Sequence, residues 1–316
     1  MDISVVVPLL NEAESLPELV SQVDRVMKEN KYSYELILVD DGSSDNSWVI
    51  INDLKNKFTS LRGIKFRRNF GKSAALHTGF QAAKGEVVMT MDADLQDSPE
   101  EIPEFYRMIT NEGFDLVSGW KKKRHDPLLS KNIPSRFYNR TVRLMTGIKL
   151  HDFNCGIKAY RKRVIKSIEI YGDMHRFIPV LAKWAGFKKI GEKVVLHQER
   201  KYGTTKFGME RFMRGPLDLL SVMFMSKYGK RPMHLFGTLG TLTFIFGFVM
   251  AAILGIKKLI AVSNHTLAPL VTQSPYFYIG LTCMVIGTLL FLSGFLGELI
   301  SRSSTDRNHY LIEEEF

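Results

Sequence analysis

Two carboxylates that directly follow an apolar run are the residues of this chain best suited to chemistry. The strand-like run 86–91 is followed by Asp92 and Asp94, with Gln96 two residues further on. Residues i and i+2 of a strand point to the same side, so a strand that continues through them would aim both carboxylates at one point. Mg²⁺ or Mn²⁺ is typically held by one or two carboxylates together with water and substrate phosphates. The spacing predicts a metal–diphosphate site, with solvated turn residues or a helix N-cap as the alternative.

Two earlier strand-like runs also end in polar residues. The run 3–7 leads into Pro8 and Glu12, and the run 34–39 leads into Asp41. In open α/β sheets, ligands bind beyond the carboxyl ends of the strands. A carboxylate after the second strand is well placed to accept hydrogen bonds from a base or from ribose hydroxyls. Together, the three strand ends predict a nucleotide site.

The residues around Gly71 and Lys72 resemble a phosphate-binding loop at first sight. The Walker pattern needs a glycine five positions before Gly71, and Phe66 stands there, so we reject that interpretation. We expect Asn69, Gly71 and Lys72 to form the entry to a helix instead, and to face the nucleotide from the side.

Strand-like and helical patterns alternate through the first two thirds of the chain. The alternation predicts an α/β fold over residues 1–215, with a mostly parallel sheet covered on both faces. Right-handed crossovers would then place the carboxyl ends of the strands along one edge. The expected strands cover residues 3–7, 34–39, 61–66, 86–91, 114–118 and 189–196, and the expected helices cover residues 16–29, 47–57, 73–83 and 103–111.

The last third of the chain contains two long uncharged stretches. Residues 235–256 and 276–297 are each long enough to cross a bilayer as a helix. The basic residues that flank the pair favour a hairpin with both ends in the cytoplasm. We therefore expect a multi-pass protein of the cytoplasmic membrane, with its catalytic domain in the cytoplasm and its copies associating through the spans. An interfacial amphipathic connector over 216–234, a hairpin over 235–300 and a cytoplasmic tail over 301–316 complete this organisation.

The composition narrows the classes of partner. The net charge of +10 indicates an anionic partner, such as a nucleotide or a phospholipid surface. Nucleic acid would explain the charge but not the acidic strand ends, so it is not expected. Cys155 and Cys283 are the only cysteines, and they provide neither a disulfide framework nor a zinc site. No secretory signal opens the chain, and a reducing cytosolic setting fits.

Two basic groups of residues lie outside the strand ends. Arg136, Arg140 and Arg143 have helical spacing and would line one stripe, either to grip a lipid headgroup or to attract an anionic surface in general. Arg200 and Lys206 enclose a glycine-containing loop that reads as a lid able to close on a diphosphate. A solvated loop is the alternative for this second group.

These residues resemble the inverting family 2 glycosyltransferases with the GT-A fold. Within that family the chain looks most like the polyprenyl-phosphate glycosyltransferases, whose relatives include dolichol-phosphate mannose synthase. The resemblance covers nearly the whole chain: it rests on residues 7–12, 39–43, 69–72 and 92–96, on the Arg200–Lys206 loop and on the membrane hairpin.

The resemblance implies roles for individual residues. Asp94 and Gln96, with Asp92 close by, would hold Mg²⁺ or Mn²⁺, and Arg200 and Lys206 would close on the nucleotide sugar. Lys121 stands where the family usually has an arginine, and Leu10 replaces a common tyrosine. The acceptor phosphate would meet Arg136 or Arg140. The residues expected to bind the nucleotide sugar are Pro8, Leu10, Glu12, Val39, Asp41, Lys72, Asp92, Ala93, Lys121, Arg200 and Lys206.

The resemblance also implies a reaction. The enzyme would transfer a hexose, with inversion, from a UDP- or GDP-sugar to polyprenyl (undecaprenyl) phosphate at the cytoplasmic face of the membrane. UDP-glucose is the slightly favoured donor. The product would serve the modification of cell-envelope glycans. A lipid phosphate is already an ionised nucleophile, which suits a chain without an obvious catalytic histidine. A processive polysaccharide synthase and a catalytically degenerate membrane scaffold are the alternatives.

Overall fold

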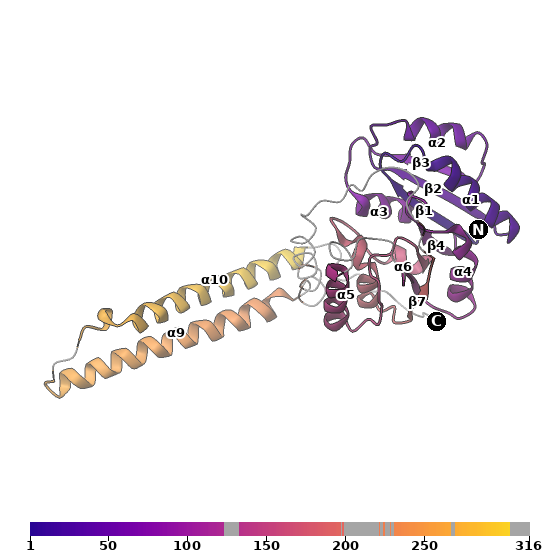
Figure 1. The fold of residues 1–316 in the computed structure, drawn as a ribbon. Helices are drawn as coiled ribbons and strands as arrows, with labels where there is room; N and C mark the ends of the chain where they lie inside the picture. The colour runs from indigo at the N-terminus through magenta and orange to yellow at the C-terminus, as the bar shows by residue number, and fades with distance from the viewer. Residues whose placement is uncertain are drawn as a thin grey trace. The chain divides into compact units, whose positions relative to one another are not determined.

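The computed structural model describes residues 1–122, 133–196, 231–266 and 269–303, together with residues 198, 221, 224 and 228. Side chains at 131–138 and at 302–303 are not described. The chain divides into two compact units, Met1–Val222 and Met223–Phe316 (Figure 1). The predicted connector over 216–234 and the predicted tail over 301–316 lie largely outside the described residues.

The first unit is built on one sheet with the strand order β3-β2-β1-β4-β6-β5-β7. Neighbouring strands run parallel except at β6, which is antiparallel to both β4 and β5. The prediction of a mostly parallel sheet is therefore confirmed. The strands are β1 (Ile3–Leu9), β2 (Tyr34–Asp40), β3 (Leu61–Lys65), β4 (Val87–Thr90), β5 (Leu116–Trp120), β6 (Lys158–Arg161) and β7 (Ile190–Val194).

The helices of this unit follow the predicted alternation closely. The four predicted helices correspond to α1, α2, α3 and α4, with ends that differ by at most two residues. A short 3₁₀ turn, η1 (Pro99–Glu101), precedes α4, and a second one, η3 (Met174–Phe177), precedes α7. The helices are α1 (Leu16–Glu29), α2 (Ser47–Lys55), α3 (Lys72–Ala82), α4 (Ile102–Thr110), α5 (Ile133–Thr146), α6 (Lys162–Lys166) and α7 (Ile178–Trp184).

Strand β6 is the strand that the sequence analysis missed. It is four residues long and contains a buried lysine, Lys158, so it shows neither the length nor the apolar run typical of a central strand. Its two antiparallel neighbours nevertheless place it in the middle of the sheet. This position brings the residues that precede it next to the end of β4.

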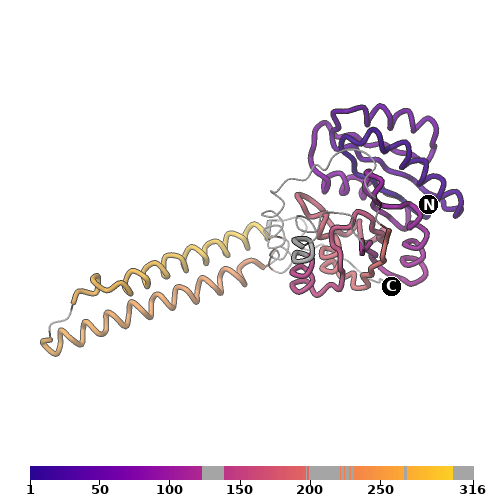
Figure 2. The backbone as a smooth tube through the Cα atoms, viewed as in Figure 1, coloured from indigo at the N-terminus to yellow at the C-terminus, as the bar shows by residue number. Residues whose placement is uncertain are grey.

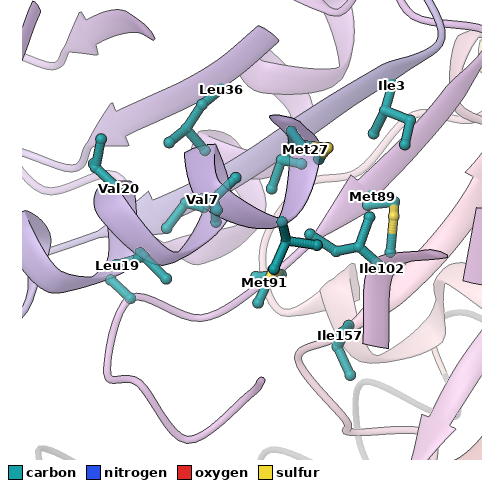
Figure 3. Packing of buried hydrophobic residues seen from close by; sticks show 14 of the residues in the cluster. Ile3, Val7, Leu19, Val20, Met27, Leu36, Met89, Met91, Ile102 and Ile157 are labelled. Atoms are coloured by element: carbon teal, nitrogen blue, oxygen red, sulfur yellow. The ribbon is translucent and has the colours of Figure 1, made fainter. Parts of the chain in front are cut away.

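The two faces of the sheet are covered by different helices. Val5, Val7 and Met89 face α1 and α4 and form the main core with their apolar residues (Figures 1 and 3). On α1 these residues recur at the three- and four-residue spacing that makes one helical face. Helix α3 covers the opposite face, where Gly79 approaches Val6 so closely that a Cβ atom would lie 2.3 Å from Val6 Cγ1. The site described below lies at the strand ends on the α3 side.

The end of β4 differs from the prediction. The strand ends at Thr90, two residues before Asp92, and Asp94 lies in the turn that follows. Leu95 closes this turn with a φ of 58°. The argument that Asp92 and Asp94 share one face of a strand is therefore wrong, because no strand continues through them.

The second unit is a pair of long apolar helices, α9 (Pro232–Ser263) and α10 (Pro275–Ser303), which lie side by side (Figure 2). Both are long and apolar enough to cross a membrane, and they contain the predicted spans. Glycines allow the two backbones to approach closely: a Cβ on Gly247 would lie 2.3 Å from the Gly280 carbonyl oxygen, and one on Gly240 would lie 2.6 Å from that of Gly287. Small residues at such positions are typical of helices that pack within a bilayer.

Candidate active site

The carboxyl ends of β1, β2 and β4 bring several predicted nucleotide residues together. Pro8 of β1 lies opposite Val39 in the parallel register with β2. Asp41 directly follows β2, and its backbone N–H donates to the carbonyl of Leu9. Asp92 follows β4, which is paired to the other side of β1. The three strand ends therefore meet at one edge, as predicted.

Asp41 holds the loop that leads into α3. Its carboxylate accepts hydrogen bonds from the backbone N–H of Phe70 at 2.7 Å and from that of Gly71 at 2.9 Å. Gly71 has a φ of 95°, a conformation that favours glycine, and it is the N-cap of α3. Burial raises the pKa of Asp41 although the two backbone donors oppose it. The loop over 66–71 is thus fastened to the end of β2.

Lys72, the first residue of α3, forms an ion pair with Asp92. Its Nζ lies 2.5 Å from Asp92 Oδ1. Burial alone would raise the pKa of Asp92, but the nearby ammonium groups of Lys72, Lys121 and Lys158 outweigh it and lower that pKa below its usual range. Asp92 is therefore ionised and surrounded by cations.

Lys121 and Asp97 form a second, more buried pair beside the first. Lys121 Nζ lies 2.9 Å from Asp97 Oδ1, and the Asp97 side chain is fully buried. Burial would lower the pKa of Lys121, but Asp97 and Asp92 raise it. The Asp92 backbone N–H donates to Asp97 Oδ2 at 3.4 Å. Asp97 thus links Lys121 to the backbone of Asp92.

Asp94 and Gln96 lie in the turn after Asp92. Asp94 Oδ1 accepts the Gln96 backbone N–H at 3.2 Å, and the carbonyl of Gln96 accepts the N–H of Gln198. Across the described residues no three His, Cys, Asp or Glu side chains gather around one point. Carboxylate and amide oxygens are nevertheless donors that Mg²⁺ and Mn²⁺ prefer, and one or two carboxylates suffice when substrate phosphates complete the shell. The donor set of Asp94 and Gln96 fits such an ion.

A small cavity of about 20 Å³ lies beside Asp92 on the α3 side. Besides Pro8, Lys72 and Asp92, it is lined by polar residues that the sequence analysis did not select: Asn154, Lys158, His175 and Arg176. Ser73 Oγ accepts a hydrogen bond from the backbone N–H of His175 at 3.0 Å. The same oxygen lies 3.0 Å from the ring nitrogen Nδ1 of His175. Burial lowers the pKa of His175 well below its usual range, and the cations Lys72 and Arg176 lower it further, so the imidazole is neutral.

No local signal identifies this second group in the sequence. Asn154 and Lys158 belong to β6 and the segment before it, and His175 and Arg176 belong to the 3₁₀ turn η3. Neither segment shows a ligand-like spacing. Only the fold brings them within reach of Asp92.

The remaining predicted residues fall into three groups. Ala93 is buried, whereas Leu10 and Glu12 are partly exposed in the turn after β1. Arg140 is exposed on α5. The side chain of Arg136 and all of Arg200 and Lys206 lie outside the described residues.

The chain belongs to glycosyl transferase family 2, whose family model matches residues 4–169. Its fold is also that of solved glycosyltransferases. A crystal structure of the glucosyl-3-phosphoglycerate synthase of Mycobacterium tuberculosis, in complex with Mn²⁺ and UDP-glucose, superposes with a TM-score of 0.55 at 18% identity, covering 71% of this chain and 78% of that one. The protein is thus a glycosyltransferase of the GT-A fold.

Two relatives narrow the class further, and both match over nearly the full length. The dodecaprenyl-phosphate galacturonate synthase of Rhizobium johnstonii is 37% identical, covering 96% of this chain and 88% of the relative. The undecaprenyl-phosphate 4-deoxy-4-formamido-L-arabinose transferase of Aeromonas hydrophila is 34% identical, covering 99% and 93%. Within the family, the chain is therefore similar to polyprenyl-phosphate sugar transferases.

Proposed function

We propose that this protein transfers a sugar from a nucleotide-diphospho-sugar to polyprenyl phosphate at the cytoplasmic face of a membrane. The observation that carries the proposal is the meeting of Asp41, Asp92 and Lys72 at one sheet edge, in a chain that also carries two helices able to span a bilayer. The names of the two relatives support the lipid phosphate as acceptor.

The nucleotide would bind along the ends of β1 and β2. Pro8 and Val39 would lie against the base, and Leu10, Glu12 and Asp41 would contact the base or the ribose. Asp92, Ala93 and Lys121 would face the ribose, the diphosphate and the sugar. Asp41 holds the loop over 66–71 in place, which supports a preformed nucleotide site. Donor binding then loses no conformational entropy to ordering this loop.

Asp94 and Gln96, with Asp92 nearby, would hold Mg²⁺ or Mn²⁺. When bound, such an ion neutralises charge on the leaving diphosphate. Lys72, Arg200 and Lys206 would supply further positive charge to the same oxygens, which favours the transition state over the ground state. A phosphate oxygen of the lipid attacks the anomeric carbon as the bond from that carbon to the diphosphate breaks, and the configuration inverts. The acceptor oxygen is already ionised, so the neutral His175 has no proton to remove.

The membrane helices would keep the acceptor close to the site. A polyprenyl chain held in the bilayer raises the effective concentration of its phosphate at the membrane surface. Arg136 and Arg140 of α5 are the proposed contacts for that phosphate. We also propose that residues 1–215 form the cytoplasmic catalytic domain, that both ends of the 235–300 hairpin are cytoplasmic, and that copies associate through the spans in the cytoplasmic membrane.

A donor screen tests the proposal. Purified protein would be incubated with undecaprenyl phosphate, Mg²⁺ or Mn²⁺ and radiolabelled nucleotide sugars. UDP-glucose comes first, then GDP-mannose, then the galacturonate and 4-deoxy-4-formamido-L-arabinose donors that the relatives' names suggest. Label should pass to the lipid extract with one of them, and D94N should abolish that transfer while leaving the melting temperature unchanged. Absence of lipid-linked label with every donor would overturn the proposal.

A further inference from the structure

Arg176 is a buried cation without a partner in the described part of the chain. The residue is 9% exposed and lines the cavity beside Asp92. Its Nε is fully buried and has no hydrogen-bond partner, and no ion pair to Arg176 occurs among the described residues. A buried charge is costly unless an opposite charge or a hydrogen bond compensates it. Arg176 is therefore suited to bind an anionic group of a ligand.

Lys158 adds a second buried cation to the same cavity. Its residue is 4% exposed, and its Nζ donates to the carbonyl of Cys155. Burial lowers the pKa of Lys158, and the nearby Lys72 lowers it further, whereas Asp152 and Asp92 oppose the shift. Among the described residues, the charged side chains that line the cavity are Lys72, Lys158 and Arg176, and one carboxylate, Asp92, which already pairs with Lys72.

The location of this positive charge connects it with the donor sugar. The cavity shares Pro8, Lys72 and Asp92 with the proposed nucleotide-sugar site, so a group that enters it belongs to a molecule bound there. Its volume of about 20 Å³ holds a group of very few atoms. A planar carboxylate is smaller than a tetrahedral phosphate ester and matches the two parallel donors of a guanidinium.

We propose that Arg176, assisted by Lys158, binds the carboxylate of a hexuronic acid, so that the donor of this enzyme is a nucleotide-diphospho-hexuronate. Asn154 and the neutral His175 lie in the same wall and supply hydrogen bonds to sugar hydroxyls. A neutral hexose offers no opposite charge to the buried Arg176 guanidinium, so the site discriminates against it. This inference rests on the proposed transfer to polyprenyl phosphate and specifies its donor.

The first test compares four donors on the wild-type protein with undecaprenyl phosphate: UDP-galacturonate, UDP-glucuronate, UDP-galactose and UDP-glucose. A site whose buried charges match the substrate should prefer the uronate by about 100-fold or more in kcat/KM over the hexose of the same configuration. Transfer from neutral hexoses without any preference for a uronate would overturn the inference and leave the proposed function standing. No transfer from any of these four donors would also overturn the inference, and the proposed function itself would be contradicted only if the other donors of the wider screen gave no lipid-linked label either.

The second test uses R176M, with R163M as the matched control. Arg163 is half exposed on α6 and pairs with Asp115, away from the cavity. R176M should reduce the preference for the uronate at least tenfold, through a higher KM for the uronate donor, and R163M should retain it. R176K keeps the positive charge but not the paired N–H donors of the guanidinium, so its preference for the uronate should lie between those of R176M and R163M. It also serves as the test variant if R176M does not fold.

Two outcomes would assign Arg176 to another anion and overturn the inference. A loss of affinity for UDP, measured by calorimetry on R176M, would place Arg176 on the diphosphate. A rise in the KM for undecaprenyl phosphate with every donor would place it on the acceptor. Only a loss confined to the uronate donors supports the carboxylate.

Discussion

The carboxylate of Asp92 lies directly against the backbone of Gly156. A Cβ atom built on Gly156 would be 2.5 Å from Asp92 Oδ2 and 2.6 Å from Asp97 Oδ2. Gly156 precedes β6, and its carbonyl accepts the hydroxyl of Thr90 at 2.8 Å. Only glycine, which has no Cβ atom, fits at this position.

The substitution G156A should therefore displace both carboxylates and impair transfer. We expect kcat/KM to fall at least 100-fold, with a loss of stability of about 1–3 kcal/mol from overpacking. G172A is the control, because a Cβ atom on Gly172 would have no neighbour among the described residues within 4 Å and only the φ of 52° opposes the change. Full activity of G156A would show that the position of Asp92 does not matter.

Removal of the Asp41 carboxylate should loosen the loop over 66–71. D41A leaves the N–H groups of Phe70 and Gly71 without their acceptor, at a cost of about 1–3 kcal/mol. The loop contains the exposed Arg67 and Arg68, so trypsin should cleave there faster in D41A than in the wild type. D53A, at an exposed position on α2, should be cleaved like the wild type. An unchanged cleavage rate in D41A would mean that other contacts hold the loop.

His175 should make stability depend on pH near neutrality. Its pKa in the folded protein is well below the ordinary value of 6.5, so the unfolded chain binds a proton that the folded one does not as the pH falls below about 6.5. Stability should then decrease with falling pH, by at most about 1.4 kcal/mol per pH unit for this one group.

Intrinsic fluorescence can follow this effect, because Trp48, Trp120 and Trp184 all lie in the first unit. Between pH 7 and 5.5 the melting temperature in detergent should fall more steeply in the wild type than in H175N. H265N changes an exposed histidine of the second unit and should behave like the wild type. Parallel curves for the wild type and H175N would exclude a buried neutral His175.

The close contact between α9 and α10 predicts the effect of a large residue at Gly247. Its Cβ position is 2.3 Å from the Gly280 carbonyl oxygen and 2.9 Å from the Cβ of Cys283, both across the helix pair. G247L should force the helices apart and lower the temperature at which the detergent-solubilised protein aggregates, as measured by size-exclusion chromatography after heating. A Cβ on Gly255, also on α9, would meet nothing from the other described parts of the chain within 4 Å, so G255L should aggregate like the wild type. Equal behaviour of the two variants would contradict the packing described here.

The local patterns of the sequence were sufficient to predict most strands, several helices and the two membrane spans. Alternating strand and helix patterns predicted six of the seven strands and helices α1 to α4, because their apolar periodicity is long and regular. The acidic residues at three strand ends predicted one shared edge, and the uncharged stretches predicted α9 and α10. The roles of Asp94, Gln96, Arg200 and Lys206 remain predictions.

The tertiary structure decided what surrounds Asp92. Its pairing with Lys72 and its contact with Gly156 replace the picture of two carboxylates on one strand face. Strand β6 is too short for its pattern to be recognised, and His175 reaches Ser73 across 102 residues of sequence. Such contacts depend on the strand order of the whole sheet, in which β6 lies between β4 and β5. A local pattern reports only which residues are near in the chain, so the buried cations of the cavity emerged only from the fold.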